Sequence, residues 1–473
     1  MNVLLRIAAV SRMNNRAIEE FLSKNYSDNN VLIYAMGENC EFNPCVKKKN
    51  IYNDELFNNR EFSKIDRFFD FPPIDVPLMR KMSIYESEIY KMMDKYFPPI
   101  DSFYDRQRLY YDALRAMNGI IESNQINVFI NFGIPHEVFD FITYCLCKVK
   151  GIETIMIYRY GTIRGYLFYF RDLEENIPDY AYDVKADETS LSKDFLEEYL
   201  RYKNGNANIR PYYMRNNSIK SSIDTLWSRA KAFNKYYMGK GGMSRALSQL
   251  IEGYKTKREI RRISIEPDLK KKFLYFPLQY QPEGTSSPGA REYVNLYLIA
   301  EILSYTVPDD IYVYIKSHPN QGIRGGHNRE YYRFLNRLRN VIIVPTKYST
   351  HILEDHCMAV VTGTGTVAYE AMYKHKPTLL FGYYIYNYMP GAFTIRSVDD
   401  CRKAIADISR GIDISDQQIL DFVYNIDKRA YRTEMAIGEI GYMIDNGISF
   451  DECNSNTLAL LADAIRDFVY DEA

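Results

Sequence analysis

The chain has 473 residues, of which 46% are hydrophobic and 26% charged, the proportions of a globular protein with room for two or three domains. Its net charge of -1 argues against a general nucleic-acid binder. The seven cysteines form no CxxC pair, and no apolar run is long enough to span a membrane, which argues against a disulfide-rich, zinc-bound or integral membrane protein. The first residues, MNVLLR, do not resemble a signal peptide, so we expect a cytoplasmic location.

Strands and helices alternate through the first half of the sequence. Apolar runs predict strands at residues 3–10, 31–35, 125–131 and 155–158. Helices are predicted at residues 15–24, 84–97 and 104–123, and from Pro135 to a stop at Gly151. This alternation with short links predicts an α/β fold with a parallel sheet covered on both faces.

Two groups in this half contain chemically active side chains. Cys145 and Cys147 lie two apart on a helix, so they face different ways and are expected only to pack. His136 and Glu137 follow the strand at 125–131, where open α/β sheets bind ligands. We therefore consider both for catalysis or substrate binding, although a Glu at a helix start is often only a favourable dipole contact.

A basic stretch separates the two halves. Residues 229–272 contain 13 Lys or Arg against four Asp or Glu. Two interpretations stay open: a solvated linker face, or peripheral contact with an anionic membrane surface. We place the domain boundary in this stretch, near residue 265.

The second half repeats the alternation. Strands are predicted at residues 273–278, 311–316, 341–344 and 358–361, and helices at 291–304, 329–338, 350–356 and after Thr366. Each polar cluster follows a strand, so these clusters converge on one edge of one sheet. The residues concerned are Gln281, Glu283, Lys316, His318 and the loop Thr362, Gly363, Thr364, Gly365 and Thr366.

The loop 362–366, with sequence TGTGT, has the features of a phosphate site. Its glycines allow close backbone approach, and its hydroxyls and amides lie at a helix start that favours negative charge. Glu370, one turn into the helix, is placed to reach ribose hydroxyls. The alternative is a tight turn with a Thr cap and a solvated Glu.

Gln281-Pro282 and His318-Pro319, each after a strand, and a Gly/Thr loop before a Glu-bearing helix resemble the motifs of bacterial capsule-polysaccharide transferases, and especially of enzymes that add Kdo from a CMP-activated sugar. The loop here is TGTGT where that group has a serine-rich loop. The resemblance implies the GT-B architecture, with two Rossmann-like domains facing each other across a cleft. It would divide the chain into an acceptor-side domain at 1–265, a nucleotide-donor domain at 266–430 and a helical segment at 431–473 that packs back on the first domain.

The resemblance also implies roles for the residues. The donor site would comprise Gln281, Lys316, His318, Thr362, Gly363, Thr364, Gly365, Thr366 and Glu370. The catalytic candidates are Glu283, His136 and Glu137, and Arg164 would bind an acidic sugar carboxylate. No metal or other cofactor is expected, because a helix start, a His and a Lys can stabilise the departing phosphate directly.

The predicted function is transfer of Kdo or a related nonulosonic acid, of sialic, pseudaminic or legionaminic type, from a CMP-sugar to a bacterial surface polysaccharide. The predicted location is the cytoplasm, at the inner face of the cytoplasmic membrane. Alternatives are a CDP-glycerol-type glycerophosphotransferase, a UDP-GlcNAc 2-epimerase-like enzyme on the same fold, and a non-catalytic scaffold of polysaccharide assembly.

Overall fold

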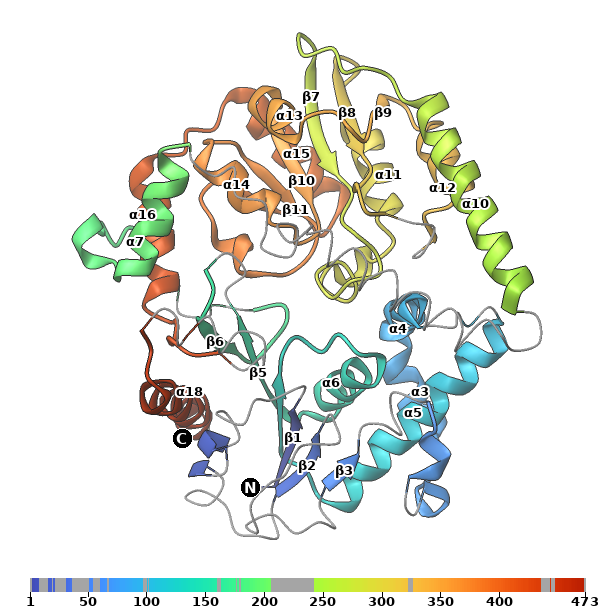
Figure 1. The fold of residues 1–473 in the computed structure, drawn as a ribbon, viewed down its shortest axis with the longest axis vertical. Coiled ribbons are helices and arrows are strands. Elements are labelled where there is room, and N and C mark those ends of the chain that lie inside the picture. The colour runs from blue at the N-terminus through green and yellow to red at the C-terminus, as the bar shows by residue number, and fades with distance from the viewer. Residues whose placement is uncertain are drawn as a thin grey trace.

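The computed structural model describes residues 2–7, 16–18, 20–21, 31–35, 51–53, 60–65, 68–96, 100, 102–159, 163–175, 177, 180–205, 242–321, 326–434, 443 and 447–471. These residues form two α/β bodies, one above the other in Figure 1, each built on a six-stranded sheet. None of the described helices combines the length and the apolar character needed to cross a bilayer.

The first sheet is parallel except at one edge. Its strand order is β3-β2-β1-β4-β5-β6, and only β6 runs antiparallel, against β5. The strands are β1 (Val3–Ile7), β2 (Val31–Ala35), β3 (Ile51–Asn53), β4 (Val128–Phe132), β5 (Glu153–Arg159) and β6 (Leu167–Phe170). All five residues of β4 are buried, and four of the five are apolar, as expected for an inner strand.

The second sheet is parallel throughout and repeats the same order. It runs β12-β11-β10-β7-β8-β9. The strands are β7 (Lys272–Pro277), β8 (Ile311–Lys316), β9 (Val341–Val344), β10 (Ala359–Thr362), β11 (Thr378–Leu380) and β12 (Ala392–Thr394). In both sheets the order reverses between the first and fourth strands, which is the Rossmann arrangement and the point where such sheets bind ligands.

The helices of the first body are α3 (Val76–Met82), α4 (Glu86–Met92), α5 (Phe103–Ser123) and α6 (Val138–Lys150). The last three lie where helices were predicted, whereas α3 was not predicted. The helix α7 (Lys193–Lys203) packs against helices of the second body. The Ser102 side chain caps α5, and α6 ends at Gly151, whose left-handed φ of 68° suits glycine. Cys145 and Cys147 are both fully buried on α6, as expected for packing residues.

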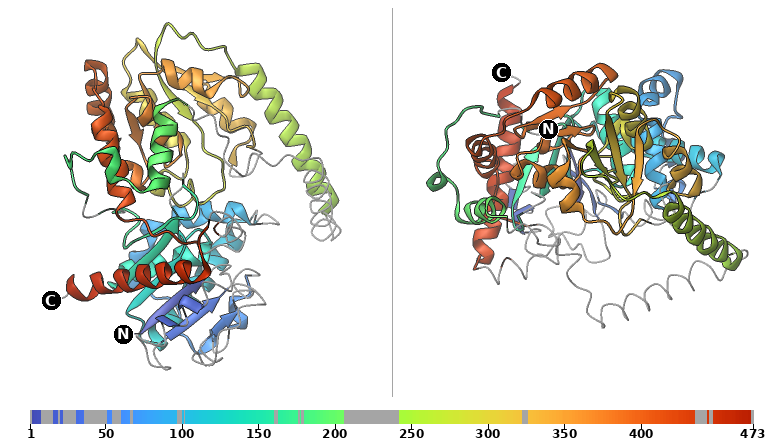
Figure 2. Two further views of the ribbon diagram at one scale, coloured as in Figure 1. Left: turned by 60° about the vertical axis from the view of Figure 1, so that its left-hand side comes forward. Right: turned by 90° about the horizontal axis from the view of Figure 1, so that it is seen from above.

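The helices of the second body and the C-terminal helix complete the fold. They are α10 (Gly242–Ile263), α11 (Tyr297–Thr306), α12 (Arg329–Leu335), α13 (Thr350–His356), α14 (Val367–Tyr373), α15 (Val398–Arg410), α16 (Asp416–Asp427) and α18 (Phe450–Asp471). In α18, Leu460, Leu461 and Ala464 pack with Val3 and Ile130 of the first sheet. The helix lies across that body in Figure 2, so the predicted return of the chain is confirmed.

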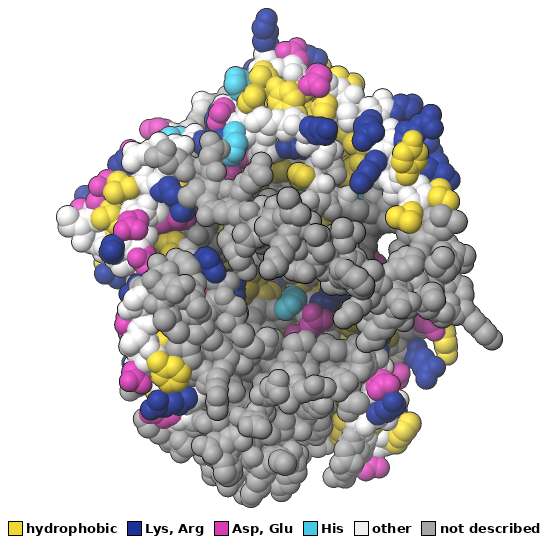
Figure 3. Space-filling view, viewed as in Figure 1, with side chains coloured by type: hydrophobic (Ala, Val, Ile, Leu, Met, Phe, Trp, Pro, Cys, Tyr) yellow, Lys and Arg dark blue, Asp and Glu magenta, His cyan; other side chains and the backbone are white. Residues whose placement is uncertain are grey.

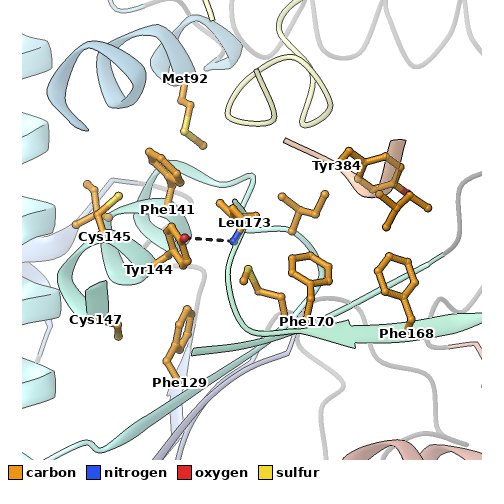
Figure 4. Close-up of a cluster of buried hydrophobic side chains, with 14 of the residues drawn as sticks. Met92, Phe129, Phe141, Tyr144, Cys145, Cys147, Phe168, Phe170, Leu173 and Tyr384 are labelled. Carbon is orange, nitrogen blue, oxygen red and sulfur yellow. Dashed lines mark hydrogen bonds between the residues drawn. The ribbon is translucent and has the colours of Figure 1, made fainter. Parts of the chain in front are cut away.

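The two bodies share a continuous core. Figure 4 shows Tyr384, from the second body, close to Phe168, Phe170 and Leu173 of the first, and all four belong to one buried cluster. Arg291 crosses the same boundary, donating to Glu88 at 2.8 Å and to Glu174 at 3.1 Å. The α/β class and the GT-B architecture of two Rossmann-like bodies are therefore confirmed. The exact domain boundaries stay a prediction.

Some element predictions were wrong. The antiparallel edge strand β6 was not predicted, because four residues are too few to show a clear hydrophobic pattern. The helix predicted at 291–304 begins at Tyr297, after a short 3-10 turn at Arg291–Tyr293. Residues 8–10 of the first predicted strand and half of the predicted helix at 15–24 lie outside the described residues, while 16–18 and 20–21 are helical.

Candidate functional site

The carboxyl edges of the two sheets face each other. A Cβ built on Gly284, in the loop after β7, would lie 3.2 Å from the Cβ of His136, in the loop after β4. Figure 3 shows a hollow between the two bodies in which a histidine, basic side chains and acidic side chains come to the surface. This hollow, between the loops that follow the strands, is the candidate site.

Gln279 links the loops at the switch point of the second sheet. Its Oε1 accepts from the backbone amides of Gly363 at 3.0 Å and Thr364 at 3.3 Å. A Cβ on Gly363 would lie 2.5 Å from that oxygen, so the close approach requires glycine. Two of the amides predicted for phosphate are thus held by the protein's own amide oxygen.

The rest of the 362–366 loop is also braced internally. The Thr362 hydroxyl accepts from the Gly365 amide at 3.0 Å, and the Thr364 hydroxyl donates to the Thr285 carbonyl. Thr362 and Thr364 are buried, whereas Thr366, at the N-cap of α14, is exposed. Its side chain makes no capping hydrogen bond.

Lys316 is the last residue of β8, at the carboxyl edge of the second sheet. Its side chain is nearly buried, and its Nζ donates to the Thr350 hydroxyl at 2.5 Å. Burial lowers the pKa of Lys316, although the Glu354 carboxylate acts in the opposite direction. The ammonium is therefore largely covered by the protein.

His318 lies two residues further on, half-buried and tilted against the ring of Tyr280 at 5.6 Å between centroids. Its Nδ1 accepts from the Asn320 amide at 3.2 Å, so in the neutral ring the proton is on Nε2. Burial and then the Lys316 charge lower the pKa of His318. The ring is therefore a neutral donor at pH 7.

Glu370 belongs to a charged cluster beside Lys316. Its carboxylate, that of Glu354 and a ring nitrogen of His351 offer ligand atoms that lie within 4.8 Å of one another. Burial, and then the Glu354 charge, raises the pKa of Glu370 to about 7. Glu354 is fully buried, and its Oε2 already accepts from the Lys374 ammonium at 2.8 Å. The cluster thus has a cation of its own.

Gln281 braces its loop from inside. It is 1% exposed, and its Nε2 donates to the Val294 carbonyl at 2.7 Å. Its Oε1 is 2.9 Å from Nε2 of the fully buried His327. Burial lowers the pKa of His327 to about 3, so that ring is neutral and structural.

The catalytic candidates of the first body form one group. His136 is exposed, and its Nδ1 donates to the Ile134 carbonyl at 3.1 Å. Its Nε2 is 3.5 Å from Oε1 of Glu137, which also pairs with Lys95 at 3.1 Å. Lys95 donates to the His136 carbonyl as well, and burial lowers the pKa of Lys95. Lys95 therefore positions both candidates.

Glu283 and Arg164 are placed differently. Glu283 is exposed in the loop after β7, and its charge contributes to raising the pKa of Tyr158 on β5, so it faces the first body. Arg164 is half-buried in the turn between β5 and β6. The structure brings Glu283, His136 and Glu137 to the facing edges, and it does not link Arg164 by a described contact to the other candidates.

The sequence did not identify Gln279, Glu354 or Lys95. Gln279 had the same signal as Gln281, a polar residue directly after a buried strand. Glu354 and Lys95 carried no signal of that kind. Their positions in the sequence do not indicate that Glu354 lies near Glu370, 16 residues away, or that Lys95 lies near Glu137, 42 residues away.

Two Rossmann-like folds with facing polar edges define a GT-B type of protein. Residues 210–406 match the family model described as "Capsule polysaccharide biosynthesis protein". The predicted resemblance to the capsule-polysaccharide proteins is therefore confirmed over this segment, which includes β7 to β12 and their loops. The search of curated proteins found no match.

Solved structures with long but distant alignments include three enzymes. The beta Kdo 2,7 transferase KpsC of Thermosulfurimonas dismutans is 14% identical, with 82% of this chain and 97% of that chain covered and a TM-score of 0.29. UDP-GlcNAc 2-epimerase from Neisseria meningitidis is 12% identical, with 90% and 98% covered and a TM-score of 0.26. A glycosyltransferase from Rickettsia africae is 8% identical, with 98% of both chains covered and a TM-score of 0.27. Because these identities and TM-scores are low, the fold assignment rests on the strand order of the two sheets.

Proposed function

We propose that this chain is a glycosyltransferase of capsule biosynthesis that moves Kdo or a related nonulosonic acid from a CMP-sugar to a bacterial surface polysaccharide. The observation that carries the proposal is the family match over 210–406, the segment that contains His318, Lys316 and the 362–366 loop. A metal-independent reaction is part of the proposal, with protein cations and donors stabilising the leaving phosphate.

In this proposal, the donor phosphate lies between His318 and Thr366. The Nε2–H of the neutral His318 ring donates to a phosphate oxygen, and the exposed Thr366 hydroxyl donates to another. The buried ammonium of Lys316 stabilises the negative charge of the donor phosphate. The amides of Gly363 and Thr364 already donate to Gln279, so these two residues shape the loop and do not bind the phosphate. Glu370 accepts hydrogen bonds from the ribose hydroxyls.

The acceptor is proposed to enter from the first body. Its hydroxyl would be deprotonated by Glu137, His136 or Glu283, the three titratable candidates at the facing edges. Among these we favour Glu137, because Lys95 fixes its position while His136 and Glu283 project further into solvent. Arg164 would hold the carboxylate of the acidic sugar as a planar fork. We also propose that the enzyme works at the inner face of the cytoplasmic membrane.

Calorimetric titration with CMP, CDP and UDP tests the donor site. We expect CMP to bind best, and His318→Ala to weaken CMP binding by roughly 2 kcal/mol or more, since a charge-assisted hydrogen bond is lost. His356→Ala is the matched control, because His356 is an exposed histidine at the end of α13 that bonds its own helix.

Preference for UDP would favour the epimerase-like alternative, and preference for CDP the glycerophosphotransferase. Binding of CMP that is equal in the wild type and in His318→Ala would remove His318 from the donor site. Failure to bind any nucleotide would support the non-catalytic scaffold.

A further inference from the structure

One side of α10 exposes apolar and basic side chains together. The exposed fractions are 69% for Leu250, 45% for Ile251 and 68% for Tyr254. The next two turns add exposed Lys255, Lys257, Arg258 and Arg261. Residues 250, 254, 258 and 261 follow helical spacing, so they share one side of the helix. We call these seven residues the α10 face.

The opposite side of the helix is anchored to the second body. Thr256, Glu259 and Ile263 are buried there. Glu259 accepts from Arg333 of α12 at 3.0 Å and from Arg262 at 2.6 Å, so its charge is already neutralised. Figure 2 shows α10 standing out from the body along much of its length. The α10 face is therefore held outward by packing on the other side.

The charge of the α10 face is not compensated by the protein. Among the residues that the structure describes, Lys255, Lys257, Arg258 and Arg261 make no salt bridge, whereas the neighbouring exposed Arg262 pairs with Glu259. Figure 3 shows dark blue and yellow side chains gathered over the position of α10. Because the whole chain has a net charge of -1, this positive patch is local.

The combination favours one kind of partner. A soluble polyanion would need the positive charges but would gain nothing from three exposed apolar side chains. A bilayer interface uses both, since apolar and aromatic groups enter the headgroup boundary while Lys and Arg attract anionic lipids. We propose that the α10 face binds an anionic lipid bilayer, with Leu250, Ile251 and Tyr254 entering the interface.

This inference goes beyond the transfer reaction, because it needs neither donor nor acceptor and can fail while nucleotide binding remains intact. The test is co-sedimentation of the full chain with phosphatidylcholine vesicles, with and without phosphatidylserine, at low and high salt. We expect binding only to the anionic vesicles, weakening as salt is raised.

Two triple variants separate charge from apolar contact. Lys257→Gln/Arg258→Gln/Arg261→Gln is expected to weaken vesicle binding at least about tenfold, since each basic residue contributes on the order of 1 kcal/mol near the surface. Leu250→Ser/Ile251→Ser/Tyr254→Ser, which leaves the charge unchanged, is expected to weaken it comparably. The control Arg402→Gln/Lys403→Gln/Arg410→Gln removes the same charge from exposed positions of α15 and should bind as the wild type does.

Melting temperature and CMP titration of each variant show whether it is folded. Loss of vesicle binding in the charge variant alone would show attraction to the anionic headgroups only, and would overturn the proposed entry of Leu250, Ile251 and Tyr254 into the interface. Equal binding by all three variants would overturn it too. A third outcome would also overturn the proposal: the wild type sediments without vesicles, and only the apolar variant does not. The α10 face would then join copies of the chain to each other.

Discussion

At the scale of single residues, Gln279 braces the 362–366 loop. Its Oε1 accepts from two buried amides, those of Gly363 and Thr364. We expect Gln279→Ala to lower the free energy of unfolding by about 1–3 kcal/mol, because the amides lose their acceptor. Gln279→Glu keeps an acceptor oxygen and should retain more of that stability. Urea unfolding of the two variants measures the difference, and equal stability of Gln279→Ala and wild type would contradict the role.

Glu370 provides a second residue-scale prediction, on pH. Burial raises the pKa of Glu370 from 4.5 to about 7, so the folded state holds a proton that the unfolded state has released in this interval. Stability from this group is therefore lost as pH rises from about 4.5 to 7 and is constant above. We expect Glu370→Gln to gain stability relative to wild type across that window.

Thermal melting at pH 5, 6, 7 and 8 checks this result, with the exposed Glu266→Gln as the control. A constant difference between wild type and Glu370→Gln at all four values would show that Glu370 titrates normally. The same pair also tests the ribose role, since CMP should bind Glu370→Gln more weakly at pH 8.

At the scale of elements, the turn from β10 to α14 depends on glycine at one position. A Cβ on Gly363 would meet Gln279 Oε1 at 2.5 Å and the Ala290 Cβ at 3.1 Å. We expect Gly363→Ala to destabilise the protein by about 1–3 kcal/mol through overpacking, and to weaken CMP binding because the loop must move. The control is Gly253→Ala in α10, where nothing lies within 4 Å, and which should stabilise by about 0.5–1 kcal/mol. Denaturant unfolding compares the two, and similar effects would refute the packing argument.

At the scale of the whole molecule, Arg291 joins the two bodies. Its guanidinium bonds Glu88 and Glu174 of the first body, and it lies over the rings of Tyr85 and Phe141. Burial raises the pKa of Glu88, and Arg291 opposes that rise. We expect Arg291→Met to cost about 3–5 kcal/mol, because it leaves a buried carboxyl without its partner.

The double variant Arg291→Met/Glu88→Leu provides the control, since it removes both charges and should recover much of the loss. Unfolding followed by denaturant gives the coupling energy. Additive effects of the two substitutions would mean that the pair does not hold the bodies together.

The sequence determined the order and direction of most elements. Mainly apolar runs such as Val128–Phe132 and Ile311–Lys316 are typical of inner strands, and their alternation with helices favours a parallel sheet. It also placed His318, Lys316 and the 362–366 loop at one edge, because polar residues after parallel strands share that edge. The resemblance based on these dipeptides agrees with the family match.

Only the tertiary structure decided which of these polar groups remain available. Gln279 takes the loop amides from 84 positions away, Gln281 turns inward to His327, and Lys316 is covered by Thr350. The edge strand β6 and the Lys95 contacts with Glu137 likewise arise from packing between distant segments. Local periodicity reports burial and direction, whereas hydrogen-bond partners across the chain depend on how the two bodies close on each other, which no spacing in the sequence specifies.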